Sequence, residues 1–247
     1  MQRSCKELKR IARGNLTNKY TVPLKAYLWS ALITMLIEFP FSMMQTKEVL
    51  STRNIIIFAA QLLISIASIV LICGEYRIHL QMARGQKTEL KQLFYPLTNQ
   101  PDRYILARLL YLGLVLVGML PMIAALILIY PENTTMIFLP AFLTIVSGIL
   151  LLIVTLNFDL VFFFMVDDEN LTIVEAFRKC QESMKGHKRR YLYLSLSFLG
   201  MLLLVVLSLG VATLWVRPYM NQTITLLYLD VTGQLDSIED PVLNPYN

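Results

Sequence analysis

Four charged residues lie inside long apolar stretches of the sequence: Glu38, Arg108, Asp159 and Arg217. An ionised side chain in the hydrocarbon of a membrane costs about 2.5–3.5 kcal/mol on insertion scales, so each of them needs a partner or a polar cavity. Charges of this kind mark a path for an ion or small solute, or form pairs that neutralise each other and fix helix register. Arginines near a helix end can also reach the interface along their apolar stems.

The depth of each charge along its helix predicts how the four combine. Glu38 should lie roughly 8 Å below the outer face and Asp159 roughly 10 Å from the inner end of its span, at 1.5 Å per residue. We therefore predict an outer pair, Glu38 with Arg217, and an inner pair, Asp159 with Arg108. The inner cluster has three further candidate members: Glu75, Arg77 and His79.

No pattern for catalysis accompanies these charges. The sequence contains no GxSxG, HExxH or phosphate-binding glycine loop, and its two histidines, His79 and His187, both lie at the ends of apolar runs. The acidic run 167–169 resembles a metal cluster, but its position before a helix cap favours a role at the helix N-terminus. The three cysteines have no CxxC spacing. We expect no enzyme activity, metal or cofactor.

The composition indicates that lipid is the solvent for much of the chain. Of its 247 residues 56% are hydrophobic and only 16% are charged, whereas soluble domains contain about 25% charged residues. The net charge of +5 comes from the connecting segments. It sets orientation and does not indicate nucleic-acid binding. The predicted fold class is all-α, a polytopic transmembrane helix bundle.

Apolar runs of about 20 residues or more place the spans. We expect spans at 23–43, at 54–73 with its helix continuing to Gly85, at 104–130 with a kink at Pro121, and from about 140 to 166 as one tilted helix with residues 162–164 at the interface. The last run allows two interpretations. Residues 191–216 form one span, or spans at 191–207 and 211–230 are joined by a turn at 208–210.

Lysines and arginines predict the orientation of the spans. There are seven through Lys25, five in 74–104 and six in 167–190, against two in 44–53 and none in 131–135. Basic segments stay on the inner side, so we predict a cytoplasmic N-terminus in the cytoplasmic membrane. A basic cluster after the fourth span is expected to bind anionic lipid headgroups; it comprises Lys185, His187, Lys188, Arg189 and Arg190.

Two short amphipathic helices are predicted outside the spans. Residues 4–13 form a basic helix that lies against anionic lipid or starts the chain in solvent, and Gly14-Asn15 should end it. Residues 171–185 begin with a capping box, Thr172 with Glu175. The apolar stripe of this second helix docks on the bundle or binds a partner protein.

Three blocks of the sequence resemble a bacterial integral-membrane family of unknown function, domain of unknown function 975. They are 74–85 with 93–94; 171–176 with 183–188; and 196–200 with 208–211, 214–215, 218–219 and 227–228. The resemblance favours six spans over five. It also implies a tyrosine–aspartate pair at the cytoplasmic face, Tyr228 with Asp230, whereas Arg217 stands where an apolar residue is more usual. The family has no established activity, so it implies no catalytic residue.

The sequence thus predicts a single membrane domain over 1–247, with a basic segment at 1–22, the helix bundle at 23–230 and a flexible acidic tail at 231–247. We expect an accessory or scaffold protein, in contact with lipid and with another membrane protein. The alternative is a small transporter or channel, and an enzyme acting on lipid-linked substrates is a more remote third. A water-accessible cavity that reaches Glu38 and Asp159 would favour transport. An exposed groove beside 173–184 would favour partner binding.

Overall fold

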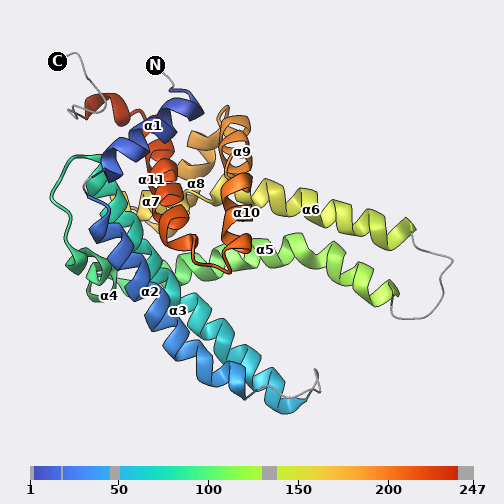
Figure 1. The fold of residues 1–247 in the computed structure, drawn as a ribbon. Helices are drawn as coiled ribbons and strands as arrows, with labels where there is room; N and C mark the ends of the chain where they lie inside the picture. Colours follow the sequence, from blue (N-terminus) through green and yellow to red (C-terminus); the bar gives the residue numbers. More distant parts are fainter. Residues whose placement is uncertain (1–2, 18, 45–50, 130–137, 239–247) are drawn as a thin grey trace.

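A computed structural model describes residues 3–17, 19–44, 51–129 and 138–238, and within these ranges the fold is all-α (Figure 1). The elements in chain order are α1 (Cys5–Leu16), α2 (Thr21–Met43), α3 (Thr52–Ala83), η1 (Leu90–Leu93), α4 (Tyr95–Thr98), α5 (Pro101–Ile129), α6 (Phe138–Phe158), α7 (Val161–Asp167), α8 (Ile173–Met184), α9 (Lys188–Leu196), α10 (Leu199–Leu207), α11 (Thr213–Val231) and η3 (Leu235–Ser237). The predicted turn at 131–135, part of the 44–53 loop and the end of the acidic tail lie outside the described residues.

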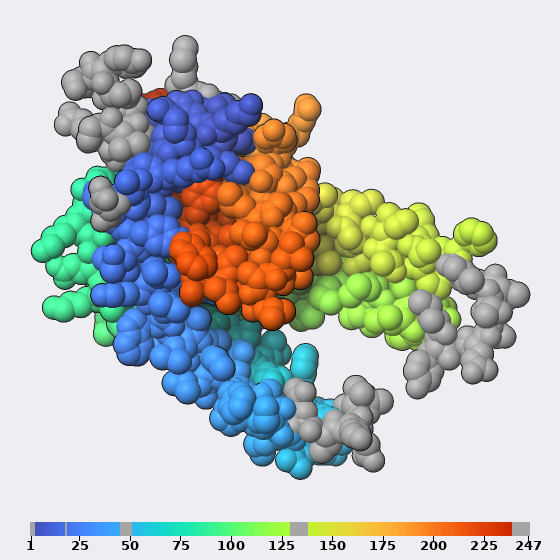
Figure 2. Space-filling view, viewed as in Figure 1, coloured from blue at the N-terminus to red at the C-terminus, as the bar shows by residue number. Residues whose placement is uncertain are grey.

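Two long helical pairs extend in different directions from a common base. Figure 1 shows α2 with α3 as one arm and α5 with α6 as the other, with α10 and α11 between them. The arms meet at the base, where α3 contacts α5, α7 and α11 as well as α2. The space-filling view shows the far ends of the two arms standing apart (Figure 2). We call the pairs the α2–α3 arm and the α5–α6 arm.

Within the described ranges, five helical segments are long and apolar enough to cross a membrane, which fits a multi-pass membrane protein. They are Thr21–Met43, Thr52–Ala83, Pro101–Leu128, Phe138–Asp167 and Lys188–Leu207. The large apolar side chains that remain exposed on these helices, such as Leu63 and Phe142, have lipid as their natural environment.

The chain reverses between α10 and α11, as the two-span interpretation of the last run requires. Leu209 and Gly210 adopt positive φ angles of 50° and 90°, which turn the backbone where a helix would otherwise continue. At 19 residues, α11 is about 28 Å long, close to the thickness of a bilayer core. It is less apolar than the five segments because it is buried within the bundle, where Gln222, Thr223 and Thr225 are fully enclosed.

The fourth span is not the continuous tilted helix that we predicted. The helix breaks at Asp159 and Leu160 and restarts as α7. Phe163 is buried between Tyr76 and Tyr228, with ring centroids 4.2 and 5.6 Å away, and residues 162 and 164 are buried as well. The expectation that residues 162–164 lie at the membrane interface was therefore wrong, because the break turns them into the protein core.

The two amphipathic helices both pack on the bundle. The apolar face of α1, including Leu8 and Ile11, is fully buried, and α1 lies against α11. Neither a lipid-facing nor a solvated position was therefore correct for this face, and α1 continues past Gly14-Asn15 to Leu16. The capping box of α8 is present, and Phe177 and Cys180 of its stripe are buried. Docking on the bundle is thus the correct interpretation of that stripe.

Candidate functional site

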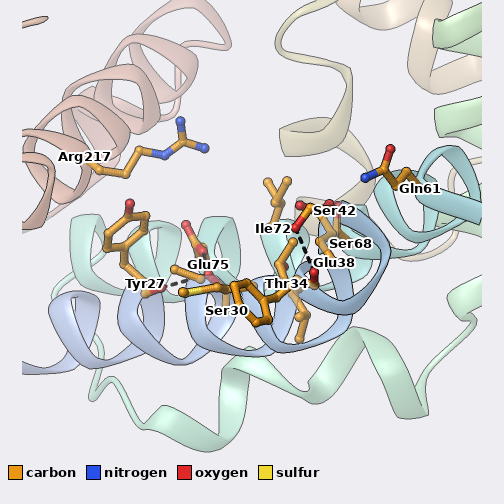
Figure 3. Close-up of a pocket in the computed structure, with 14 residues that line it drawn as sticks. Tyr27, Ser30, Thr34, Glu38, Ser42, Gln61, Ser68, Ile72, Glu75 and Arg217 are labelled. Atoms are coloured by element: carbon orange, nitrogen blue, oxygen red, sulfur yellow. Dashed lines mark hydrogen bonds between the residues drawn. The ribbon is translucent and has the colours of Figure 1, made fainter. Parts of the chain in front are cut away.

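A cavity of about 500 Å³ runs along the α2–α3 arm, from Tyr27 and Glu75 toward Ser42 near the end of α2. Its wall combines apolar side chains with nine polar or charged ones from α2, α3 and α11: Tyr27, Ser30, Thr34, Glu38, Ser42, Gln61, Ser68, Glu75 and Arg217. In Figure 3 Arg217 reaches from α11 into this space near Tyr27 and Glu75, while Ser42 and Gln61 lie at the other end. We call this space the arm cavity.

Glu75 forms the buried acidic wall of the arm cavity. Its side chain is 4% exposed. Ser30 donates a hydrogen bond to one carboxylate oxygen, and the Asn221 amide nitrogen lies 3.4 Å from the other. One turn further along α3, His79 Nδ1 is 2.7 Å from Gln222 Oε1. Polar pairs therefore join α3 to α2 and α11 inside the protein, which satisfies buried groups that lipid could not.

A second cavity, of about 290 Å³, lies between α3, α5, α11 and the break before α7. Arg108, Tyr111, Asp159 and Arg217 contribute polar groups to its wall. Tyr191 donates a hydrogen bond to the Asp159 carboxylate. The Arg108 guanidinium lies 5.8 Å from the centre of the Tyr111 ring. We call this space the junction cavity, because it lies where the two arms meet.

Arg217 and Ile72 line both cavities. The two spaces are therefore neighbours. Acids of the α2–α3 arm, Glu38 and Glu75, lie on one side, and Arg108 and Asp159 lie on the other. Arg217 thus lies at the boundary between the two spaces.

The structure brings each predicted pair of intramembrane charges into one cavity. Glu38 and Arg217 share the arm cavity, and Asp159 and Arg108 share the junction cavity. Among the described residues no ion pair joins either couple. Direct pairing within the outer pair and within the inner pair stays a prediction. Arg217 of the outer pair also lines the cavity that holds the inner pair.

The family model described as protein of unknown function (DUF975) matches residues 1–234. The chain belongs to this family. The match includes every residue that lines the two cavities. Comparisons with curated proteins and with solved structures gave no match.

The basic end of this DUF975 protein is held together by arginine–carboxylate pairs. Arg84 binds Asp167 at 2.5 Å and Arg77 binds Glu169 at 2.8 Å. Arg103 donates to the main-chain oxygens of Asp168 and Glu169, both at 2.9 Å. Asp167 and Glu169 thus pair with arginines at the end of α3. The N-terminus of α8 is capped by Thr172 and Glu175. The predicted role of the acidic run at that N-terminus was wrong.

Three other residues that the sequence singled out, Arg77, Tyr228 and Asp230, have partners within the DUF975 protein. Arg77, proposed for the inner charge cluster, stacks over Tyr95 at 3.7 Å and pairs with Glu169 outside both cavities. Tyr228 and Asp230 do not bind each other, because Tyr228 donates to Asp167 at 2.8 Å and Asp230 pairs with Arg190 at 2.5 Å.

The predicted lipid-binding cluster divides into exposed and engaged residues. Lys185 and Arg189 are exposed, and Lys188 and His187 are half-buried. Arg190 is occupied by the buried Asp230 carboxylate and by the main-chain oxygen of Arg3. Lipid binding at the first four stays a prediction, while Arg190 has a structural partner inside the protein.

Sequence reasoning missed the neutral residues that complete the site. Ser30, Tyr191, Asn221 and Gln222 supply hydrogen bonds to the buried charged or imidazole groups. The available signal was the polar run at 221–223 inside an otherwise apolar segment. Polar residues at successive positions of a membrane helix indicate contact with other helices or a cavity.

Proposed function

We propose that this protein is a small transporter or channel of the cytoplasmic membrane, without catalysis of its own, and that solute passes through the arm and junction cavities. The observation that carries the proposal is that Arg217 lines both cavities. One side chain therefore borders both spaces, and a site between helices within the membrane is where alternating access operates in transporters.

The size and lining of the cavities support this function. Volumes of about 500 and 290 Å³ are near the range of roughly 300–1,000 Å³ for small-molecule sites. Ionisable residues inside a membrane domain typically line solute paths, because any other position leaves their charge unsolvated. Here three acids and two arginines gather at the two spaces.

The accessory or scaffold role that the sequence favoured has less support. Partner binding would be favoured by an exposed apolar groove beside 173–184. Phe177, Cys180 and Met184 of the apolar stripe are buried against the bundle, and the groove that does lie beside α8 is lined largely by polar groups such as Lys179, Glu182 and Ser183. The charged cavities, which a scaffold does not need, are the feature that sequence analysis had connected with transport.

The proposed orientation follows from the basic end of the molecule. The segments 84–103 and 167–190 and helix α1 carry most of the lysines and arginines. We place this end in the cytoplasm, with the N-terminus, by the positive-inside rule. The arms then extend toward the outer leaflet.

Thiol labelling in intact cells tests whether the arm cavity holds water. Cys73 and Cys180 are fully buried, so replacing Cys5 alone gives a suitable background. We expect Thr34→Cys and Ser68→Cys to react with a membrane-impermeant methanethiosulfonate. Leu63→Cys is the matched control on α3, because Leu63 is 68% exposed but does not line the cavity. Equal labelling at Ser68 and Leu63 would count against a water-filled path.

Solute flux tests the transport proposal directly. Proteoliposomes shrink in a hyperosmotic solute and swell again only if that solute enters. The solutes would be glycerol, glycine, lactate and inorganic phosphate. We expect at least one of them to enter faster than into protein-free vesicles, and to slow in Arg217→Leu. If no solute enters faster and the cavity cysteines stay unlabelled, the transport proposal fails.

A further inference from the structure

We propose that the ligand of these cavities carries a carboxylate or phosphate group, and that Arg217 and Arg108 bind this group in the junction cavity. The inference rests on the proposed function and specifies the chemical class of its solute. It depends on which charged groups already have hydrogen-bond partners within the protein and which do not.

The acids of the two cavities are already supplied with neutral donors. Glu75 accepts from Ser30 and lies within hydrogen-bonding distance of Asn221, and Asp159 accepts from Tyr191. Such donors satisfy part of the hydrogen-bonding capacity of a buried carboxylate. Arg217 acts on both acids, and Arg108 on Asp159, through charge at longer range, but among the described residues neither acid forms an ion pair with an arginine.

Among the described residues, Arg108 and Arg217 have no comparable hydrogen-bond partner. The Nε atoms of Arg108 and Arg217 are buried and have no hydrogen-bond partner, and neither side chain forms an ion pair. The nearest aromatic contact, Arg108 with Tyr111, is long at 5.8 Å. Both side chains are half-buried, and a charged donor that is withdrawn from water and lacks an acceptor is costly, so both guanidinium groups favour a bound acceptor.

The alternative is that both arginines reach out of the membrane along their stems. The burial of both Nε atoms argues against this, because the stem and the start of each guanidinium stay within the protein. Both side chains instead line the junction cavity. One group in a space of about 290 Å³ would therefore contact both.

The charge of the junction cavity favours an anion. Its ionisable wall consists of Arg108, Arg217 and Asp159, two cations and one anion with a net charge of +1, and the aspartate is engaged by Tyr191. Guanidinium groups bind carboxylate and phosphate through two parallel N–H···O bonds. The arm cavity, with Glu38, Glu75 and Arg217, has a net charge of −1, so the anionic end of a ligand belongs in the junction cavity.

The anionic group has two sources, a free solute or the headgroup of a lipid that enters between the arms. Thermal unfolding of the full chain in nanodiscs separates them. The first experiment uses phosphatidylcholine nanodiscs titrated with inorganic phosphate or acetate, and compares them with sodium chloride of equal ionic strength. The other uses nanodiscs that contain phosphatidylglycerol, with no added anion.

Four proteins would be compared: wild type, Arg217→Gln, Arg108→Gln, and Arg178→Gln as control. Arg178 is exposed on α8 and lines neither cavity. We expect added anion to raise the unfolding temperature of wild type and Arg178→Gln, and the apparent affinity to fall at least tenfold in Arg217→Gln and Arg108→Gln. Arg217→Lys, which keeps the charge but loses the two-pronged geometry, should show an intermediate loss.

Each outcome has a defined meaning. Stabilisation by phosphate or acetate in phosphatidylcholine supports a free anion. Stabilisation by phosphatidylglycerol that both glutamine variants lose supports a headgroup. If the unfolding temperature rises in neither experiment, or rises equally in all variants, the inference is overturned. Anion binding without flux would refute the proposed transport alone. Flux of glycerol that Arg217→Gln leaves unchanged, with no anion binding, would refute this inference alone.

Discussion

At the scale of single residues, the interior of this protein is specified by close contacts and by charges held away from lipid. Gly74 of α3 packs directly on the backbone of Leu93 in η1. Arg190 is paired with Asp230, whose side chain is 3% exposed. Each contact joins segments distant in sequence at the basic end, from which both arms extend. Changes at these two positions therefore test the framework on which the cavities depend.

Replacing Gly74 by alanine should destabilise the fold. A Cβ atom at this position would lie 2.0 Å from the Leu93 carbonyl oxygen, and a backbone atom cannot move aside as a side chain does. We expect Gly74→Ala to lower the free energy of unfolding by about 1–3 kcal/mol, the usual cost of overpacking. Gly113→Ala, in α5 with no atom near its Cβ, should gain about 0.5–1 kcal/mol from helix propensity. Thermal unfolding in detergent measures both changes, and equal stability of the two variants would contradict the prediction.

Breaking the Arg190–Asp230 pair should be more costly than removing the neighbouring exposed charge. Arg190→Gln leaves the Asp230 carboxylate buried without its cation, a loss of about 3–5 kcal/mol for a buried pair. Arg189→Gln, at an exposed position, should change stability by less than about 0.5 kcal/mol. Denaturant unfolding compares the two variants. A change below 1 kcal/mol for Arg190→Gln would mean that water reaches Asp230.

At the scale of elements, the position of α8 depends on its N-terminal cap and on the helices that its apolar face contacts. The helix α8 begins at its capping box because the Thr172 side chain accepts from the Glu175 main-chain nitrogen, while the Glu175 carboxylate accepts from the Thr172 nitrogen. The buried stripe then fixes this helix on α6 and α7.

The start of α8 should become less stable in acid. The hydrogen bonds from Thr172 lower the pKa of Glu175, so the carboxylate form is favoured in the folded state. A lowered folded-state pKa contributes stability that is complete above the ordinary glutamate pKa, about 4.3, and is lost as pH falls through the lower folded value. Hydrogen exchange of the first turn of α8 between pH 3 and 6 should show this loss.

The variant Thr172→Ala should remove that pH dependence and cost about 1 kcal/mol as a lost N-cap. Thr172→Ser, which keeps the hydroxyl, is the control and should retain both. If exchange in Thr172→Ala keeps the wild-type pH profile, another group controls the helix start.

At the scale of the whole molecule, the positions of the basic segments determine which way the arms point. The segments 84–103 and 167–190 meet at one end, where Arg84 pairs with Asp167 and Arg103 donates to the main-chain oxygens of Asp168 and Glu169. The fold thus brings together the basic segments that the positive-inside rule assigns to the same side of the membrane. Charge patterning and tertiary contacts agree on this point.

A topology reporter inserted at Gly186 should be cytoplasmic. Gly186 has a φ of 84° and no atom near its Cβ position, so an insertion there does not disturb packing. We expect alkaline phosphatase at this position to be inactive and green fluorescent protein to fluoresce, with the reverse result in the predicted outer turn at 131–135. Phosphatase activity at Gly186 would reverse the orientation and, with it, the sides assigned to both cavities.

The sequence alone determined the helical class, the helices of the first three spans and the capping box. These features are local, since each depends on the length of an apolar run or on residues three or four positions apart. The residues 162–164 show the limit of this approach. Their aromatic side chains suit a membrane interface, but after the break at Asp159 they are buried, with Phe163 and Phe164 against Tyr228 and Phe162 against Tyr111.

The tertiary structure decided which polar groups meet. Ser30, Tyr191 and Asn221 are separated by more than a hundred residues from at least one of the others, yet they supply hydrogen bonds to Glu75 and Asp159 within neighbouring cavities. Depth along a helix predicts the level of a side chain but not the direction in which it points. That direction depends on how the helices rotate against each other, and here it leaves two arginines facing a shared space without a partner among the described residues.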